Sequence, residues 1–417
     1  MQDTQSSDHK LRIAIDCRID DFRQGVGTAV QVLAKTLSNS STMDQEYTFI
    51  VLESMRDALA PYVYGPCTLE CVPTSRLSSL KSALRRITPL RFLRKKLRRG
   101  TAQVPKSNGY VESRNFDLIH FPTQVAYRTN LPTIYQPWDL QHLHYPQFFP
   151  NEDFAHRERC YRAFCDQAFF VCVQAEWTRQ DVILQYGIAK EKVVVIPWGS
   201  VFDAYTEPSE RERRAAVEKY NLPSRFFFYP AVTWPHKNHE IILNALCSLK
   251  KTDGLAPHVF FTGASTDYRS TLDKIAQDLG VAAQVHFLGF VTPTELQTIF
   301  ISATAMIFPS RFEGFGLPIL EAFHARLPVL ASNATTLPEV AQDGALYFDP
   351  DSPDELAMLM REVLESQERR RELIEKGSHV LSQHSITKTA AGFQALYKAT
   401  AALARNDRRP SANSGSE

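Results

Sequence analysis

The stretch Phe308-Pro-Ser-Arg-Phe-Glu-Gly-Phe-Gly-Leu-Pro-Ile-Leu-Glu321 decides how this chain is expected to fold. The apolar residues that end at Phe308 are typical of a buried strand, and Pro318 predicts the start of a helix, where proline is favoured. Gly314 and Gly316 allow the backbone between the two to turn sharply and to approach a ligand closely. The stretch is therefore predicted to join a strand to a helix through a loop suited to ligand binding.

The polar groups of this stretch suit a ligand with phosphate and hydroxyl groups. The unpaired N–H groups of Gly316 and Leu317 are expected to point out of the helix N-terminus, a ready site for a diphosphate. Glu321, in the first helical turn, is placed to accept hydrogen bonds from a pair of ribose hydroxyls. Glu313, on the loop, is free to face a sugar. The alternative is a plain strand–loop–helix connection in which a glutamate only caps the helix.

Strands alternate with helices on both sides of this stretch, which favours parallel sheets covered by helices on both faces. The alternation restarts after a charged helical segment at 207–219, so we predict an α/β chain of two tandem, doubly wound Rossmann-like domains. Ligands of such sheets bind at the carboxyl ends of the strands, so the site is expected in a cleft between the domains. The expected strands are residues 12–16, 47–52, 117–121, 133–135, 169–173 and 193–196 in the first series, and 225–229, 258–263, 284–288, 305–308, 328–331 and 345–348 in the second.

The bulk composition fits this division. At 417 residues the chain is too long for one ordinary core, and 44% hydrophobic with 22% charged residues is typical of a soluble globular protein. No apolar run approaches the roughly 20 residues of a spanning helix, and the polar N-terminus does not resemble a secretory signal. The seven cysteines include no C-x-x-C pair, which favours reduced thiols in the cytoplasm over a metal site.

A basic segment stands out in the first half of the chain. Residues 76–99 contain ten Lys or Arg and no acidic residue, and Leu or Ile recurs every three or four positions. Such an amphipathic helix suits anionic lipid headgroups, at about 1 kcal/mol for each basic residue near the surface. A helix packed on its own domain with a solvated basic back fits equally well. Nucleic acid is disfavoured, because no aromatic residue beyond Phe92 is available for stacking.

The acidic stretch resembles the E-x7-E element of retaining glycosyltransferases of family 4, which have the GT-B fold. It reads Glu313-Gly-Phe-Gly-Leu-Pro-Ile-Leu-Glu321, with both carboxylates present. The loop Trp234-Pro-His-Lys-Asn-His239 resembles the diphosphate-binding loop of that family, with Lys237 as its lysine. The resemblance covers most of residues 12–385. Further similar segments are Gly25-Val-Gly27, 176–179, 195–199, Leu337-Pro-Glu-Val340 and 345–350.

The resemblance implies transfer of a hexosyl group from a nucleoside diphosphate sugar, with retention at the anomeric carbon and without a metal ion or other cofactor. The forms of the lysine loop and of the acidic element resemble members that transfer mannose or rhamnose-type sugars. The acceptor is then a glycan or a lipid-linked glycan, the latter at the cytoplasmic membrane face. The implied catalytic residues are Asp139, Lys237 and Glu313; the donor-binding residues are Gly25, Gly27, Lys237, Gly316, Leu317 and Glu321; and the acceptor-side residues are Asp139 and His142.

These predicted roles give a name to each part of the chain. The last helical segment is long enough to cross back onto the first domain, an arrangement that the sequence leaves open. The predicted parts are a disordered tail at 1–11, an acceptor-side domain at 12–200, a linker at 201–222, a nucleotide-sugar-binding domain at 223–385, a helix at 386–404 and a second disordered tail at 405–417.

The chain departs from the family pattern at two positions. Val232 stands five residues before Lys237, where the family usually has an arginine, so part of the positive clamp on the diphosphate is missing or comes from another residue. Trp138 stands where the family usually has a histidine, directly before Asp139. A third motif, Asp349-Pro-Asp351, spells the metal-binding triplet of a different glycosyltransferase fold, but it lies in a proline turn, where aspartate is a turn former.

Two other classes of function share this architecture. A sugar-nucleotide epimerase would release an epimerised sugar nucleotide with no acceptor present. A non-catalytic protein of the same fold would turn over no sugar nucleotide, because a fold does not fix a function.

Overall fold

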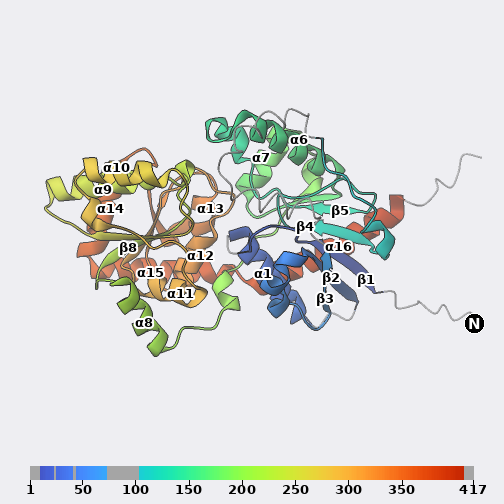
Figure 1. Ribbon diagram of the computed structural model, residues 1–417, viewed down its shortest axis with the longest axis horizontal. Coiled ribbons are helices and arrows are strands. Elements are labelled where there is room, and N and C mark those ends of the chain that lie inside the picture. Colours follow the sequence, from blue (N-terminus) through green and yellow to red (C-terminus); the bar gives the residue numbers. More distant parts are fainter. Residues whose placement is uncertain (1–9, 23–24, 41–43, 73–102, 408–417) are drawn as a thin grey trace, which may run out of the picture.

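The computed structural model describes residues 10–22, 25–40, 44–72 and 103–407, which form two α/β domains side by side (Figure 1). Each domain is built on one parallel sheet with helices on both faces, so the predicted fold class is confirmed. The basic segment at 76–99 lies outside the described residues. Within the described part of the chain, no helix combines the length and the apolar character needed to cross a bilayer.

The N-terminal sheet has seven strands in the order β3-β2-β1-β4-β5-β6-β7, and every neighbouring pair is parallel. Its interior strand β1 is almost wholly buried, as its apolar run predicts. The strands are β1 (Leu11–Asp16), β2 (Gln45–Leu52), β3 (Cys67–Val72), β4 (Leu118–Phe121), β5 (Thr133–Tyr135), β6 (Phe170–Val173) and β7 (Val193–Val195). The helices are α1 (Gly25–Ser38), α2 (Arg56–Leu59), α5 (Gln141–His144), α6 (Asn151–Gln167) and α7 (Glu176–Tyr186).

The C-terminal sheet has six parallel strands in the order β10-β9-β8-β11-β12-β13. Helix α8, within the segment predicted as a linker, packs against α11 and so joins this domain. The strands are β8 (Phe226–Pro230), β9 (His258–Thr262), β10 (Val285–Phe287), β11 (Ala305–Phe308), β12 (Val329–Ser332) and β13 (Ala345–Phe348). The helices are α8 (Glu210–Tyr220), α9 (His239–Thr252), α10 (Arg269–Asp278), α11 (Pro293–Ser302), α12 (Leu317–His324), α13 (Leu337–Ala341), α14 (Pro353–Glu365) and α15 (Gln367–Gln383).

The last helix, α16 (Ile386–Asp407), leaves the C-terminal domain and packs on α1, β1 and β4 of the N-terminal domain. Its Phe393 and Tyr397 are fully buried against the sheet. The Tyr397 hydroxyl lies 2.9 Å from Nδ1 of His120 on β4, and Nε2 of that histidine lies 2.9 Å from the Gln136 side-chain oxygen. One face of the N-terminal sheet is therefore closed by a helix from the far end of the chain.

Burial of His120 makes stability depend on pH. Burial lowers the pKa of this histidine to about 3, well below its ordinary value of 6.5. Between these values the unfolded chain binds a proton that the folded chain does not, so stability is lost as the pH falls below 6.5. In this range, His120 alone makes the wild type lose about 1.4 kcal/mol of unfolding free energy for each pH unit of acidification. We expect the His120→Gln variant to lack this contribution, because glutamine does not titrate. Urea unfolding of both proteins from about pH 7 to about pH 4 measures this, and parallel stability curves would contradict it.

Candidate active site

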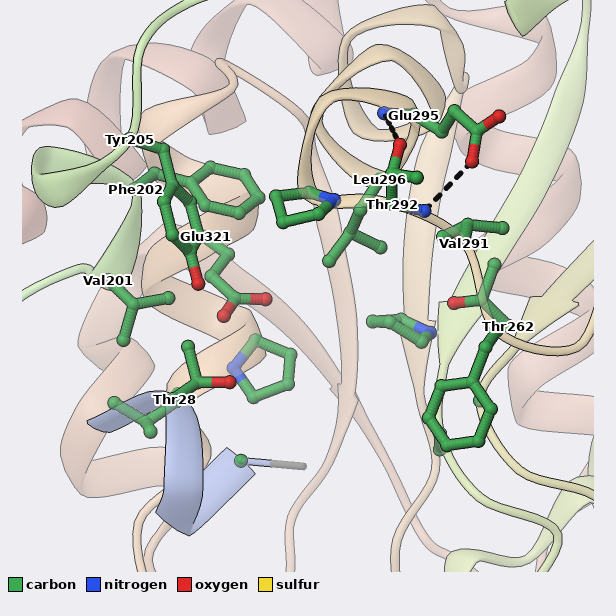
Figure 2. A pocket seen from close by; sticks show the side chains of 18 of the residues that line it. Thr28, Val201, Phe202, Tyr205, Thr262, Val291, Thr292, Glu295, Leu296 and Glu321 are labelled. Carbon is green, nitrogen blue, oxygen red and sulfur yellow. Dashed lines mark hydrogen bonds between the residues drawn. The ribbon is translucent and has the colours of Figure 1, made fainter. Parts of the chain in front are cut away.

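A cavity of about 640 Å³ lies between the domains, beyond the carboxyl ends of the strands. Figure 2 shows its polar side chains and the apolar residues between them. The N-terminal domain contributes residues from α1 and its surroundings, and the C-terminal domain supplies most of the remaining wall. The connection after β7 contributes Val201, Phe202 and Tyr205, and the N-terminal residues are Phe22, Gly25, Thr28, Gln31 and Tyr62. A cavity of this size, lined mostly by apolar groups with a few polar ones, is typical of a small-molecule site.

The acidic stretch has the predicted strand–loop–helix form. Strand β11 ends at Phe308, and α12 begins at Leu317, one residue before the predicted start. Gly316 caps the helix with a φ of 100°, a left-handed conformation that favours glycine. A Cβ atom added there would lie 2.8 Å from Cδ2 of Leu337, so neither the backbone nor the space admits a larger residue. The loop is therefore fixed in the conformation that exposes the start of α12.

Lys237 and Glu313, both predicted as catalytic, lie in contact. Lys237 Nζ is 2.6 Å from Glu313 Oε1, and both side chains are mostly buried. The next residue, Asn238, holds the lysine loop in place, because its amide donates to the carbonyl oxygens of Pro309 and Pro350. On the other side, the hydroxyl of Thr335 donates to the carbonyl oxygen of Glu313 at 3.0 Å. The structure thus brings a cation and a carboxylate from two separate loops to one point.

Asp139 approaches the same point from the N-terminal domain. Its Oδ1 accepts the N–H of Gln141 at 3.0 Å, directly after β5. Burial raises the pKa of this carboxyl, and Glu313 raises it further, whereas Arg157 and Lys237 oppose the rise. A Cβ added to Gly314 would lie 3.1 Å from Cβ of Asp139. The three predicted catalytic residues therefore meet where the domains touch.

Glu321 lines the cavity from α12. It is the fifth residue of the helix and so belongs to the second turn, not to the first turn as predicted. Burial raises the pKa of its carboxyl to about 8. Val232 also lines the cavity, so an aliphatic side chain occupies the position at which the family usually has arginine.

The glycine pair Gly25-Val-Gly27 lies in the first turn of α1 instead of in a preceding loop. Gly25 lines the cavity and has open space around its Cα. Gly27 is buried, and a Cβ there would lie 2.5 Å from Cα of Phe22. The prediction that Gly27 contacts the donor is therefore corrected: this glycine allows close packing of the helix on the chain before it.

The predicted acceptor-side role of His142 is also corrected. The side chain is fully buried among the rings of Phe149, Phe154 and Tyr161, and its Nε2 lies 3.4 Å from Glu158. Burial lowers the pKa of this histidine to about 4, so it stays neutral at physiological pH. It supports the aromatic packing of α6 and does not reach an acceptor.

Trp138 has a structural place of its own. Its backbone is left-handed, with a φ of 67°, and its indole N–H donates to the carbonyl oxygen of Pro122 at 2.8 Å. The ring packs against that of Trp198, with 5.7 Å between centroids. This tryptophan therefore positions the neighbouring Asp139. Its one polar group, the indole N–H, is already bonded within the protein and cannot replace the family histidine as a ligand contact.

Asp349 and Asp351 belong to a turn. Asp349 Oδ1 accepts the N–H of Asp351 at 2.8 Å, and Asp351 pairs with Arg311. The turn therefore already engages both carboxylates in contacts within the protein.

Glu339, which lies in one of the segments similar to the family but has no predicted role, joins the two domains. Its carboxylate, on α13, accepts the N–H groups of Glu176 and Trp177 at 2.6 and 2.9 Å, at the start of α7. Next to it, the Thr178 hydroxyl donates to the carbonyl oxygen of Gly314 at 3.0 Å. The carboxylate satisfies two unpaired N–H groups at the positive end of a helix in the other domain. The domains are therefore held together beside the acidic stretch.

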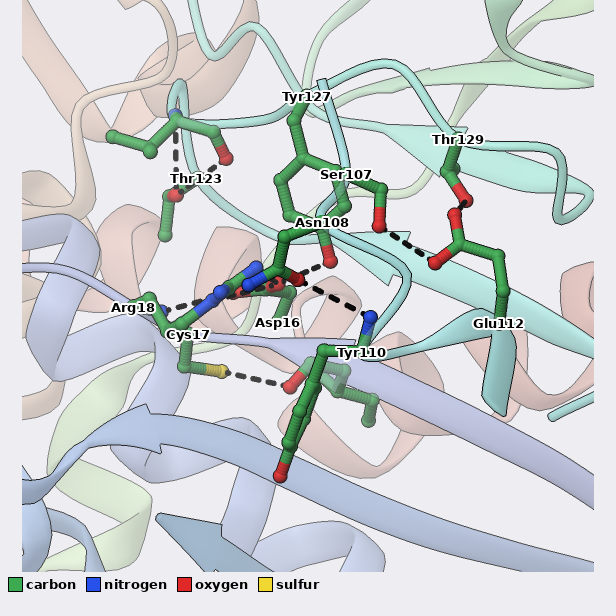
Figure 3. A network of polar contacts seen from close by, with 12 residues as sticks. Asp16, Cys17, Arg18, Ser107, Asn108, Tyr110, Glu112, Thr123, Tyr127 and Thr129 are labelled. Atoms are coloured by element: carbon green, nitrogen blue, oxygen red, sulfur yellow. Dashed lines mark hydrogen bonds and ion pairs between the residues drawn. The ribbon is translucent and has the colours of Figure 1, made fainter. Parts of the chain in front are cut away.

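A polar network fixes the end of β1 (Figure 3). Arg18 Nη2 lies 2.6 Å from Asp16 Oδ2, and the Tyr127 hydroxyl donates to the same oxygen at 2.8 Å. The guanidinium of Arg18 also lies over the Tyr127 ring, 4.9 Å from its centroid. A buried carboxylate, a cation and a phenol thus hold the chain where it leaves the sheet toward α1.

Two family models match this chain, one in each domain. "Glycosyltransferase Family 4" matches residues 24–200, and "Glycosyl transferases group 1" matches residues 210–380. The chain therefore belongs to the glycosyltransferases of the GT-B fold. Within that class, the model that matches the first domain is that of family 4. The acidic element at 313–321, in the second domain, resembles the same family.

Curated relatives and a solved structure agree with this assignment. The chain is 27% identical to O-antigen chain mannosyltransferase B of Escherichia coli over 51% of this chain and 56% of that protein. It is 32% identical to O-antigen chain mannosyltransferase RfbU of Salmonella typhimurium over 42% of this chain and 45% of that protein. The chain thus spans about half the length of these relatives. The crystal structure of Anabaena Alr3699/HepE in complex with UDP and glucose has a TM-score of 0.69 at 17% identity, covering 93% of this chain and 100% of that one, which shows the same fold.

Proposed function

We propose that this protein transfers a mannosyl group from a nucleoside diphosphate mannose to a glycan acceptor, with retention at the anomeric carbon. The observation that carries the proposal is the meeting of Lys237, Glu313 and Asp139 at the acidic stretch, whose residues Leu317 and Glu321 line a cavity large enough for a nucleotide. Mannose is supported by the two O-antigen chain mannosyltransferases to which the chain is similar. The acceptor in this proposal is a glycan, free or linked to a lipid, in keeping with the O-antigen chain for which these relatives are named.

In this mechanism, the positive groups of the C-terminal domain stabilise the leaving nucleoside diphosphate. The bond between the anomeric carbon and the phosphate oxygen breaks as negative charge grows on that oxygen. Lys237 supplies a point charge, and the N–H groups of Gly316 and Leu317 supply oriented donors, so no metal ion is required. Glu313 orients Lys237 and faces the sugar.

The acceptor enters from the side of the N-terminal domain. Asp139 orients its hydroxyl, whose oxygen forms the new bond on the face that the phosphate leaves. The hydroxyl proton passes to the departing phosphate oxygen, so the step needs no separate protein base. Contact between the domains excludes water, which would otherwise hydrolyse the donor.

Binding of the donor nucleotide can be tested by thermal unfolding. Because the nucleotide binds only the folded chain, GDP, UDP or dTDP at about 100 times its Kd should add about 2.7 kcal/mol of stability. We therefore expect at least one of the three at millimolar concentration to raise the melting temperature by several degrees. A panel of sugar nucleotides, followed for hydrolysis and for transfer to mannan oligosaccharides, then identifies the donor. The absence of a shift with all three nucleotides would contradict the proposal.

A further inference from the structure

Three oxygen-bearing side chains from three separate segments converge at one end of the cavity (Figure 2). Thr28 comes from α1 of the N-terminal domain, and Glu321 from α12 of the C-terminal domain. Tyr205 comes from the connection between the domains, directly after a short 3-10 helix at Val201–Ala204. Of the three, only Glu321 belongs to the acidic element. The proposed function gives no role to Thr28 or Tyr205.

Tyr205 is held firmly in its place. Its N–H donates to the carbonyl oxygen of Phe202 at 3.0 Å, and the two rings lie 6.2 Å apart. The short helix before it is capped by Ser200, whose hydroxyl accepts the N–H of Phe202 at 3.2 Å. Burial, and to a smaller extent Glu321, raise the pKa of this tyrosine, and a hydrogen bond with Thr28 opposes the rise. Tyr205 is therefore a neutral, fixed hydroxyl that can donate a hydrogen bond.

The carboxylate of Glu321 faces this hydroxyl group without bonding to it. Within the described part of the chain, the Glu321 carboxylate makes no hydrogen bond or ion pair, although it is close enough to Tyr205 to raise the pKa of that tyrosine (Figure 2). A partly buried carboxylate that lacks a partner is costly, and a ligand that donates hydrogen bonds would remove that cost. A ligand with adjacent hydroxyl groups fits between the two side chains.

Away from this end, the cavity wall is mixed. Phe290, Val291 and Leu296 contribute apolar surface beside Thr262, Thr292 and Glu295, and Phe290 is nearly half exposed at 47%. Apolar side chains among polar ones suit a flat ring that carries polar edge groups, whereas the paired oxygens of Tyr205 and Glu321 suit adjacent hydroxyl groups. The end with Tyr205 and Glu321 is thus where the ribose of a bound nucleotide would lie.

We propose that Tyr205 binds the ribose hydroxyls of the donor nucleotide together with Glu321, and that Thr28 orients the tyrosine hydroxyl. The inference rests on the proposed function, because it requires a nucleoside diphosphate in this cavity. It adds that the ribose is held by the connection between the domains as well as by the acidic element. Nucleotide binding then draws α1, the connection and α12 together.

Isothermal titration of Tyr205→Phe tests the assignment. GDP, UDP and dTDP are titrated into the wild-type protein, and the tighter of GDP and UDP is compared with its 2′,3′-dideoxy counterpart. Loss of one hydrogen bond should weaken binding of the ribonucleotide by about fivefold to tenfold. The same change should leave the affinity for the dideoxynucleotide unchanged, because that ligand has no hydroxyl for Tyr205 to contact. Tyr347→Phe is the matched control, since its hydroxyl donates to Gln342 in the C-terminal domain.

The possible outcomes separate the inference from the function. If Tyr205→Phe binds the ribonucleotide as tightly as the wild type, the inference is overturned and the proposed function stands. An equal loss for both nucleotides also overturns it, because the tyrosine then acts only through the shape of the cavity. If the wild type binds none of GDP, UDP and dTDP, the proposed function fails, and the inference fails with it. Binding of dTDP alone overturns the inference, because that nucleotide lacks adjacent hydroxyl groups, and leaves the proposed function standing.

Discussion

Lys237→Ala is expected to lower turnover by about 100-fold to 1000-fold, because the variant lacks the point charge that stabilises the leaving diphosphate. In the structure, Glu313 holds the ammonium group of this lysine in place through a contact of 2.6 Å. The melting temperature should fall by only a few degrees, since both side chains are partly exposed and neither belongs to a hydrophobic core. Initial rates of mannosyl transfer at saturating donor, together with thermal unfolding, measure both effects.

Lys250→Ala is the matched control for this experiment. Its Nζ donates to the carbonyl oxygen of Gly280 on the surface of the C-terminal domain, away from the cavity. This variant should turn over substrate at the wild-type rate. A rate within threefold of wild type for Lys237→Ala would contradict the assigned role of the lysine.

Gly314→Ala is expected to lower turnover by about 100-fold, because it prevents the two domains from approaching as closely as they do in the structure. A Cβ at this position would lie 2.2 Å from the carbonyl oxygen of Trp138 in the other domain. Both groups belong to the backbone, so neither can rotate away. The domains must separate, and Asp139 moves away from Lys237 and Glu313.

This prediction distinguishes closure of the domains from folding. Each domain keeps its own sheet, so the melting temperature should change little, and a nucleoside diphosphate should still raise it. Small-angle scattering should report a larger radius of gyration for the variant than for the wild type. A fully active Gly314→Ala protein would show that close contact at this point is not needed for transfer.

Local sequence patterns predicted most of the strands and missed one at the edge of the N-terminal sheet. Strand β1 and strand β11 are short apolar runs, and burial on both faces makes such runs easy to identify. Strand β3 was missed, because Cys67–Val72 has a glutamate and a threonine among its residues and lies at the edge of the sheet. An edge strand has only one neighbour to pair with, so its sequence carries a weaker pattern.

The residues of the candidate site also fall into two groups: those that a local motif predicts and those that it does not. Lys237 and Glu313 come from motifs in which the local backbone decides the geometry, and the structure brings the two together. Tyr205 and Glu339 act on parts of the chain that are distant in sequence, and no local pattern marks such residues. The role of His142 was misjudged because the aromatic side chains of α6 that enclose it become neighbours only in the folded domain.

The path of α16 sets the order in which the domains can mature during synthesis. Residues 386–407 leave the ribosome after the whole C-terminal domain, yet they cover one face of the N-terminal sheet. Until then, the apolar surface that Phe393 and Tyr397 bury is open to water and to other chains. The first domain to be translated is therefore the last to be completed, and its nascent form is the stage at which this protein most needs a chaperone.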